Sequence, residues 1–172
     1  MEDDCATFFG KYRGTVANPI DPQGLGRVQV NVPDVLGDGQ LAWAMPSTPY
    51  AGDGVGFFAI PPKDAKIWVE FERGDPDFPI WTGCFWGLGE NPAGVDPLSV
   101  FKTVLKTKKF KLEIDSNPVM PGFKLEITLL PPLGSASIAT GPTGLEIKCG
   151  GNSIVLGPVS VDINKPNLTV LK

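Results

Sequence analysis

The sequence predicts an all-β protein, and three observations support that fold class. Apolar and polar residues alternate in many short runs, as in Val28, Val30 and Val32, and this is the period of a strand with one buried face. The 21 glycines and 18 prolines are spread between these runs, where they end strands and form turns. No stretch keeps the spacing of an amphipathic helix. We therefore expect many strands and very little helix.

After an N-terminal extension at residues 1–9, residues 10–90 are predicted to form a small barrel. It begins with a hairpin from Phe9 to Pro33, whose turn is rich in Asn, Asp, Pro and Gly. The Gly- and Pro-rich stretch Pro46–Gly56 is predicted to lack regular structure. The later strands are expected at Leu41–Met45, Lys66–Glu72 and Ile80–Trp86. Five or six short strands over about ninety residues are typical of an OB-type barrel.

A linker at residues 91–100 is predicted to lead into a second module at residues 101–172. The net charge changes here, from −8 for residues 1–96 to +4 for residues 97–172. Short runs resemble one another, as in the Phe-Lys-Leu-Glu-Ile segments that begin at Phe110 and Phe123, and indicate a degenerate β repeat. Each run has one apolar side that nothing else in the chain covers, so we expect several copies to wind about one axis.

Seven residues are the predicted core of that second module. They are Leu145, Ile147, Ile154, Leu156, Val159, Val161 and Ile163.

The composition argues against an enzyme and against bound cofactors or metals. The chain has no histidine, which removes Ser-His-Asp and Cys-His catalysis and most zinc or iron sites. Cys5, Cys84 and Cys149 are odd in number and lack ligand spacing, so neither a disulfide framework nor a metal site is expected. The start of the chain does not resemble a signal peptide and no run has membrane-spanning length, so we expect synthesis in the cytoplasm.

Four clusters have a structural and a functional interpretation, and we favour the structural one each time. Gly74–Asp77 is expected to be a plain turn rather than a cation site. Glu70 and Glu72 are expected to lie on a solvated face rather than to form a glycosidase pair. The lysines of residues 102–111 are expected to face solvent or a subunit, because the acidic barrel would repel nucleic acid. The large aromatic residues are expected to pack rather than to stack on bases; they are Trp43, Tyr50, Trp68, Trp81 and Trp86.

Several segments occur together in a characteristic order. They read F-G-K-Y-R-G-T-V from Phe9, D-P-Q-G-L-G-R-V-Q-V-N-V-P from Asp21, A-W-A-M-P from Ala42, P-Y-A-G-D-G-V-G-F-F-A-I-P-P from Pro49, and I-W-V-E-F-E-R-G-D-P-D-F-P-I-W-T-G from Ile67. In this order they resemble the N-terminal barrel of phage baseplate assembly protein V, which is shared by VgrG spikes of type VI secretion systems and by extracellular contractile injection systems. The resemblance covers residues 8–87.

The resemblance implies a fold for the second module and a function for the whole chain. In that family the OB domain precedes a trimeric needle, so residues 101–172 are expected to form an intertwined trimeric β-helix or β-prism. The implied function is that of a central spike: a homotrimer on a baseplate hub that touches and punctures the target envelope when the sheath contracts. The alternative is a solitary OB-fold module that binds single-stranded nucleic acid or oligosaccharide.

The same resemblance suggests where partners would bind. Contacts with subunits or with the hub are expected at Asp21, Arg27, Tyr50 and Trp81. The chain ends without an evident taper, so we expect a separate PAAR-like tip protein. Its predicted contacts are Leu168, Val170 and Leu171.

Overall fold

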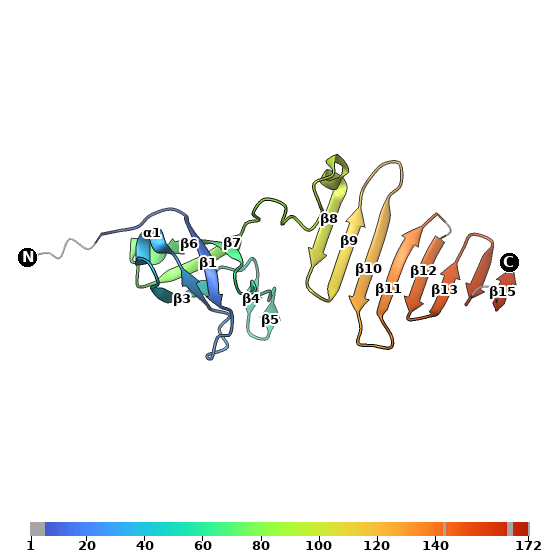
Figure 1. Cartoon of the computed structure of the whole chain (residues 1–172), viewed down its shortest axis with the longest axis horizontal. Helices are drawn as coiled ribbons and strands as arrows, with labels where there is room; N and C mark the ends of the chain where they lie inside the picture. The colour runs from blue at the N-terminus through green and yellow to red at the C-terminus, as the bar shows by residue number, and fades with distance from the viewer. Residues whose placement is uncertain (1–5, 143, 165–166, 172) are drawn as a thin grey trace, which may run out of the picture. The chain divides into compact units, whose positions relative to one another are not determined.

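The computed structural model of the chain describes residues 6–142, 144–164 and 167–171 (Figure 1). It divides into two compact units, residues 1–87 and residues 88–172. In both units nearly every regular element is a β-strand, which confirms the predicted all-β class. No helix among the described residues is long and apolar enough to cross a membrane.

The first unit is a closed barrel with the strand order β1-β2-β3-β7-β6. All neighbouring strands are antiparallel except the parallel pair β3 and β7. The sequence predicted a barrel of five or six strands, and the structure confirms a closed barrel of five. The strands are β1 (Tyr12–Asn18), β2 (Val28–Asn31), β3 (Leu41–Pro46), β6 (Lys66–Phe71) and β7 (Pro79–Cys84), with short helices α1 (Pro33–Leu36) and η1 (Glu72–Gly74) between them.

Alternating side chains of these strands fill the barrel. Val28, Val30 and Ile67 have no exposed surface, as the alternation in β2 and β6 predicts. Gly14 of β1 lies in close contact with the two strands that pair with β1, which are β2 and β6. A Cβ atom at Gly14 would be 3.1 Å from the Asn31 carbonyl oxygen and 3.2 Å from a methyl group of Val69, so a glycine fits this position best.

The prediction that Pro46–Gly56 lacks regular structure is wrong in one part. Strands β4 (Ala51–Gly52) and β5 (Val55–Gly56) form a two-stranded hairpin within this stretch. The connecting residues are Asp53 and Gly54, and Gly54 has a φ of 68°. An Asp-Gly pair is a favoured two-residue hairpin turn, so this signal was present in the sequence.

The second unit is one antiparallel sheet in which each strand pairs with the next along the chain (Figure 1). A short helix η2 (Pro97–Phe101) leads into it. The strands are β8 (Lys102–Lys106), β9 (Phe110–Asp115), β10 (Gly122–Thr128), β11 (Ser135–Gly141), β12 (Gly144–Cys149), β13 (Asn152–Leu156), β14 (Ser160–Ile163) and β15 (Leu168–Leu171).

The expectation that the chain ends without a taper is wrong, because the sheet narrows toward the C-terminus. The strands have seven residues in β10 and β11, six in β12, five in β13 and four in β14 and β15. At about 3.3 Å per residue, the sheet narrows from roughly 23 Å to roughly 13 Å. A single chain forms a sheet and not a prism, so closure of the predicted prism would require further copies.

Candidate functional site

One side of the C-terminal sheet carries a continuous column of leucine and isoleucine. Each residue of this column is the register partner of the next, and facing partners in a sheet point to the same side. The Leu/Ile column consists of Leu105, Leu112, Leu125, Ile138, Ile147, Ile154, Ile163 and Leu168. It crosses all eight strands without a polar residue.

Two further columns flank the Leu/Ile column on the same side. One contains Ile114, Phe123, Thr140, Leu145, Leu156, Val161 and Val170. The other contains Phe110, Ile127, Ala136, Cys149 and Asn152, so its side chains become smaller and then polar as the sheet narrows. We call the side of the sheet formed by these three columns the apolar face.

The apolar face is uncovered in the single chain. Ile147, Ile154 and Ile163 are 39%, 38% and 37% exposed. Among the described residues, all of the fully buried apolar side chains belong to the barrel. Full burial of one such side chain is worth about 1.5–3 kcal/mol, so this sheet forgoes much of the stabilisation available to it until something covers the face.

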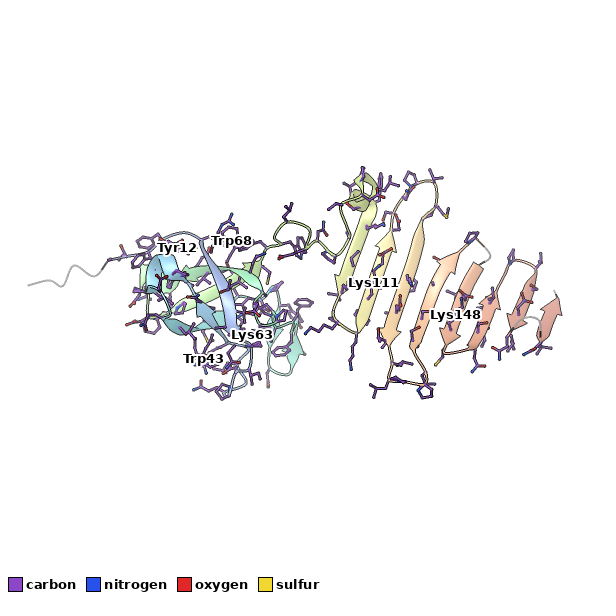
Figure 2. All side chains as sticks on the ribbon, in the orientation of Figure 1. Tyr12, Trp43, Lys63, Trp68, Lys111 and Lys148 are labelled. Atoms are coloured by element: carbon purple, nitrogen blue, oxygen red, sulfur yellow. The ribbon has the colours of Figure 1, made fainter. Side chains whose placement is uncertain are left out.

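The opposite side of the sheet, the polar face, carries ion pairs between residues two positions apart. The distances between the charged atoms are 2.6 Å for Lys111 and Glu113, 2.6 Å for Lys124 and Glu126, and 2.9 Å for Lys148 and Glu146 (Figure 2 labels Lys111 and Lys148). The hydrogen bond from Lys111 lowers the pKa of Glu113 against the opposing effect of its burial. A face of this kind is suited to water, so the apolar face is the one that needs a cover.

The predicted core residues of the second module lie as follows. Leu145, Ile147, Ile154, Leu156, Val161 and Ile163 are all on the apolar face. Val159 lies outside the strands, between β13 and β14, and is 67% exposed. Their burial in an assembly stays a prediction.

The predicted barrel contacts Asp21 and Arg27 bind each other. The Asp21 carboxylate accepts hydrogen bonds from the backbone N–H groups of Gln23, Leu25 and Arg27, at 3.0, 2.8 and 3.2 Å. It also accepts one at 2.8 Å from Nη2 of Arg27, and only 4% of its side chain is exposed. The Arg27 hydrogen bond and these backbone bonds hold the pKa of Asp21 well below its usual range. The pair therefore shapes the β1–β2 turn from within.

The other two predicted barrel contacts differ in exposure. Trp81 is 8% exposed, and its Nε1 donates a hydrogen bond of 3.3 Å to the carbonyl oxygen of Gly26. Tyr50 is 60% exposed and precedes the β4–β5 hairpin. Of the four residues, Tyr50 offers the most surface to a partner, and all four contacts stay predictions.

The predicted tip contacts belong to the last strand, β15. Leu168 and Val170 lie on the apolar face and are 50% and 54% exposed. The side chain of Leu171 lies outside the described part of the structure. Within the described residues β15 pairs with β14 on one side only, so its other edge is open.

The remaining clusters make the following contacts, although Trp86, one of the aromatic residues expected to pack, is 66% exposed in the single chain. Asp75 accepts a hydrogen bond of 3.0 Å from the backbone N–H of Asp77, as in a plain turn. Lys11 binds Glu70 at 2.8 Å. Arg27 and Arg13 lie over Trp43 and Trp68, with 5.1 and 5.3 Å to the ring centroids (Figure 2 labels both tryptophans). No group of three or more potential ligands that could hold a metal occurs among the residues that the structure describes.

Sequence reasoning missed several exposed apolar residues in loops. Phe57 and Phe58 follow the β4–β5 hairpin and are 55% and 79% exposed. The loops at the two ends of β10 carry Val119, Met120, Leu130 and Leu133, which are 89%, 65%, 74% and 53% exposed. These residues could have been found as large apolar side chains within turn segments. Alternation of apolar and polar residues, which identifies strands, does not reveal them.

Comparisons with known proteins agree with both halves of this architecture. A family profile described as the type VI secretion system/phage-baseplate injector OB domain matches residues 12–86. A second, described as the phage baseplate V C-terminal trimerisation domain, matches residues 102–169 and so spans nearly the whole sheet. The chain belongs to the phage baseplate assembly protein V and VgrG-like family. It is accordingly a spike component of the phage-baseplate or type VI kind.

One curated relative extends the comparison. The chain is 35% identical over 104 residues to the actin cross-linking toxin VgrG1 of Vibrio cholerae serotype O1. The aligned region covers 54% of the chain and 10% of that protein. The chain thus spans a small part of the relative's length, and the similarity concerns the shared region alone.

Proposed function

We propose that the chain is the homotrimeric central spike of a contractile injection machine, in which three C-terminal sheets close into a prism with their apolar faces inside. The observation that carries the proposal is the uncovered Leu/Ile column, in a segment that matches a trimerisation domain. Copies of the chain are the simplest cover, because each brings an identical column along the same axis.

The dimensions of the sheet suit this closure. Three faces of roughly 23 Å would place the backbone about 6–7 Å from the axis, close to half of the roughly 10 Å that separates packed sheets. At the narrow end the same distance is about 4 Å. Side-chain size follows this change, since Phe110 and Phe123 lie in the wide part and Val161 and Val170 in the narrow part.

The proposed role is mechanical rather than catalytic. The strands run across the axis of the prism, so the hydrogen bonds between neighbouring strands are parallel to the axis. An axial load is therefore carried by the hydrogen bonds of every strand pair together. The prism would puncture the envelope when the sheath contracts. Tyr50 and its neighbours on the barrel would bind the hub, and a PAAR-like tip protein would cover Leu168 and Val170 at the open edge of β15.

Light scattering of the purified chain tests the central claim. The expected result is a mass near three times 18.3 kDa that survives dilution. A monomer that binds oligonucleotides in a salt-dependent way would contradict the proposal and favour a solitary OB-fold module. A particle reconstruction with a bare, self-closed apex would contradict the tip protein alone.

A further inference from the structure

We propose that the corners of the trimer are locked by a loop of one copy that inserts into a hollow of the next. The loop is Leu129–Gly134, between β10 and β11. The hollow lies at the opposite rim of the sheet, between Ser116–Pro121 and Pro142. This inference rests on the proposed trimer and adds the contact that sets its axial register.

The inserting loop holds two leucines away from its own sheet. The backbone N–H of Leu129 donates a hydrogen bond of 2.9 Å to the carbonyl oxygen of Gly134, and that of Leu133 donates one of 3.1 Å to Leu130. These bonds close the loop on itself. Leu130 and Leu133 remain 74% and 53% exposed, which is unfavourable unless a partner covers them.

The receiving hollow has a volume of about 500 Å³. Val119, Met120 and Pro121 form its wall on one side and Pro142 lies on the other. Its floor belongs to the polar face of the sheet, where Glu113, Asp115 and Lys124 line it beside Gly122 and Gly141. Asp115 and Asn117 hold the wall in place, because their side chains accept hydrogen bonds of 2.9 Å from the backbone N–H groups of Asn117 and Val119. Val119 and Met120 are thereby kept 89% and 65% exposed.

The topology puts the loop and the hollow at the same height. In an antiparallel meander, successive hairpin loops alternate between the two rims of the sheet. The β10–β11 loop therefore lies on one rim, level with the gap between the β9–β10 and β11–β12 loops on the other rim. Rotation about an axis parallel to the strand stacking brings the first rim of one copy against the second rim of the next without axial shift.

Among the described residues, the height of the β10–β11 loop is the height at which the loops on both rims carry large apolar side chains. The β8–β9 turn on the rim of the leucine loop consists of Thr107, Lys108 and Lys109, and the β12–β13 turn consists of Gly150 and Gly151. Neither presents a large apolar side chain. The leucine loop has thus one matching hollow on the neighbouring copy.

The loop contact would fix the axial register of the three copies, which the Leu/Ile column alone does not fix. That column is nearly uniform along the axis, so copies shifted by two strands, roughly 9.6 Å, would still pack apolar face against apolar face. A two-strand shift would, however, bring Leu130 and Leu133 against a different pair of loops. The contact therefore selects the trimer in which all three copies are level.

Cross-linking tests the contact in the full chain. Cys5, Cys84 and Cys149 are first replaced by alanine, and Met120→Cys and Leu133→Cys are then introduced together. A short bismaleimide reagent is expected to give a covalent ladder of dimers and closed trimers. Met120→Cys alone and Met120→Cys with Glu146→Cys are the matched controls, because Glu146 lies on the polar face in the middle of β12, paired with Ala139.

A second variant measures the effect on assembly. Leu130→Ser with Leu133→Ser is expected to raise the concentration at which the trimer dissociates by roughly tenfold or more. Val95→Ser removes a similarly exposed valine outside the sheet and is expected to change nothing. A trimeric mass with neither cross-links nor weaker assembly would overturn the loop contact and leave the trimer intact. A monomeric mass for the unmodified chain would overturn both.

Discussion

At the scale of single residues, the Asp21 carboxylate yields a stability prediction with a defined pH dependence. Asp21→Asn removes the negative charge that binds Arg27 and replaces one of the two side-chain oxygens that accept hydrogen bonds in the turn. The urea concentration at the midpoint of barrel unfolding should therefore fall at pH 7. Because the native pKa of Asp21 lies below the unfolded value of about 3.9, its contribution is full above that pH and is lost as the pH falls through the native pKa.

Tryptophan fluorescence at pH 7 and pH 3 measures this effect. The difference between the wild type and Asp21→Asn should be smaller at pH 3. Asp38→Asn is the control, because Asp38 is an exposed loop residue in the same unit. A difference that grows toward acid would contradict the assignment.

Ile147 and Lys148 are neighbours on opposite faces of β12 and give a matched test of the apolar face. Ile147→Asp would bring three carboxylates together near the axis, where burial of each unpaired charge costs several kcal/mol, so the trimer should not form. Lys148→Ala removes one exposed ion pair worth at most about 1 kcal/mol, so the trimer should persist. Light scattering on both variants decides. A trimeric Ile147→Asp would rule out this face as the interior.

At the scale of elements, Gly144 shows why the start of β12 is intolerant of side chains. Its φ of 121° is in the region that favours glycine, and a Cβ atom there would meet the carbonyl oxygen of Leu156 on the neighbouring strand. Gly144→Ala should therefore destabilise the C-terminal unit by about 1–3 kcal/mol or more. Gly151→Ala, with open space around its position, should have little effect. Thermal unfolding followed by far-ultraviolet circular dichroism distinguishes the two.

Most elements of the barrel could be predicted from local pattern. Val28, Val30 and Val32 alternate with polar residues because one side of β2 faces the core, and that period is readable in any short window. The β4–β5 hairpin was missed because its strands have two residues each, too few for a period to appear. Its Asp53-Gly54 turn was the better signal.

The second unit was predictable in most of its strands and in its uncovered side, but β8, β11 and the register were not predicted. The Phe-Lys-Leu-Glu-Ile runs identify β9 and β10, whereas the alignment of Leu112 with Leu125 depends on loop lengths that a period does not encode. The exposure of Leu130 and Leu133 could not be read from the sequence, because exposure on a rim depends on the folded sheet.

At the scale of the whole molecule, the two units differ in where their stability comes from. The barrel contains a buried apolar core formed by residues such as Val30, Ile67 and Val69. The sheet has its apolar side chains on one open face, and copies of the chain would have to supply the other half of its core. A unit that depends on its partners gains stability with concentration, while a self-contained unit does not.

The chain should consequently unfold in two steps that respond differently to protein concentration. All four tryptophans lie between Trp43 and Trp86 in the first unit, so fluorescence reports on the barrel and circular dichroism on both units. The fluorescence midpoint should not move with concentration. The second step should shift by about 2.7 kcal per mole of trimer for each tenfold increase, because three chains form one folded sheet assembly. A second step that is independent of concentration would mean that the sheet is stable as a single chain, and the trimeric spike would have to be abandoned.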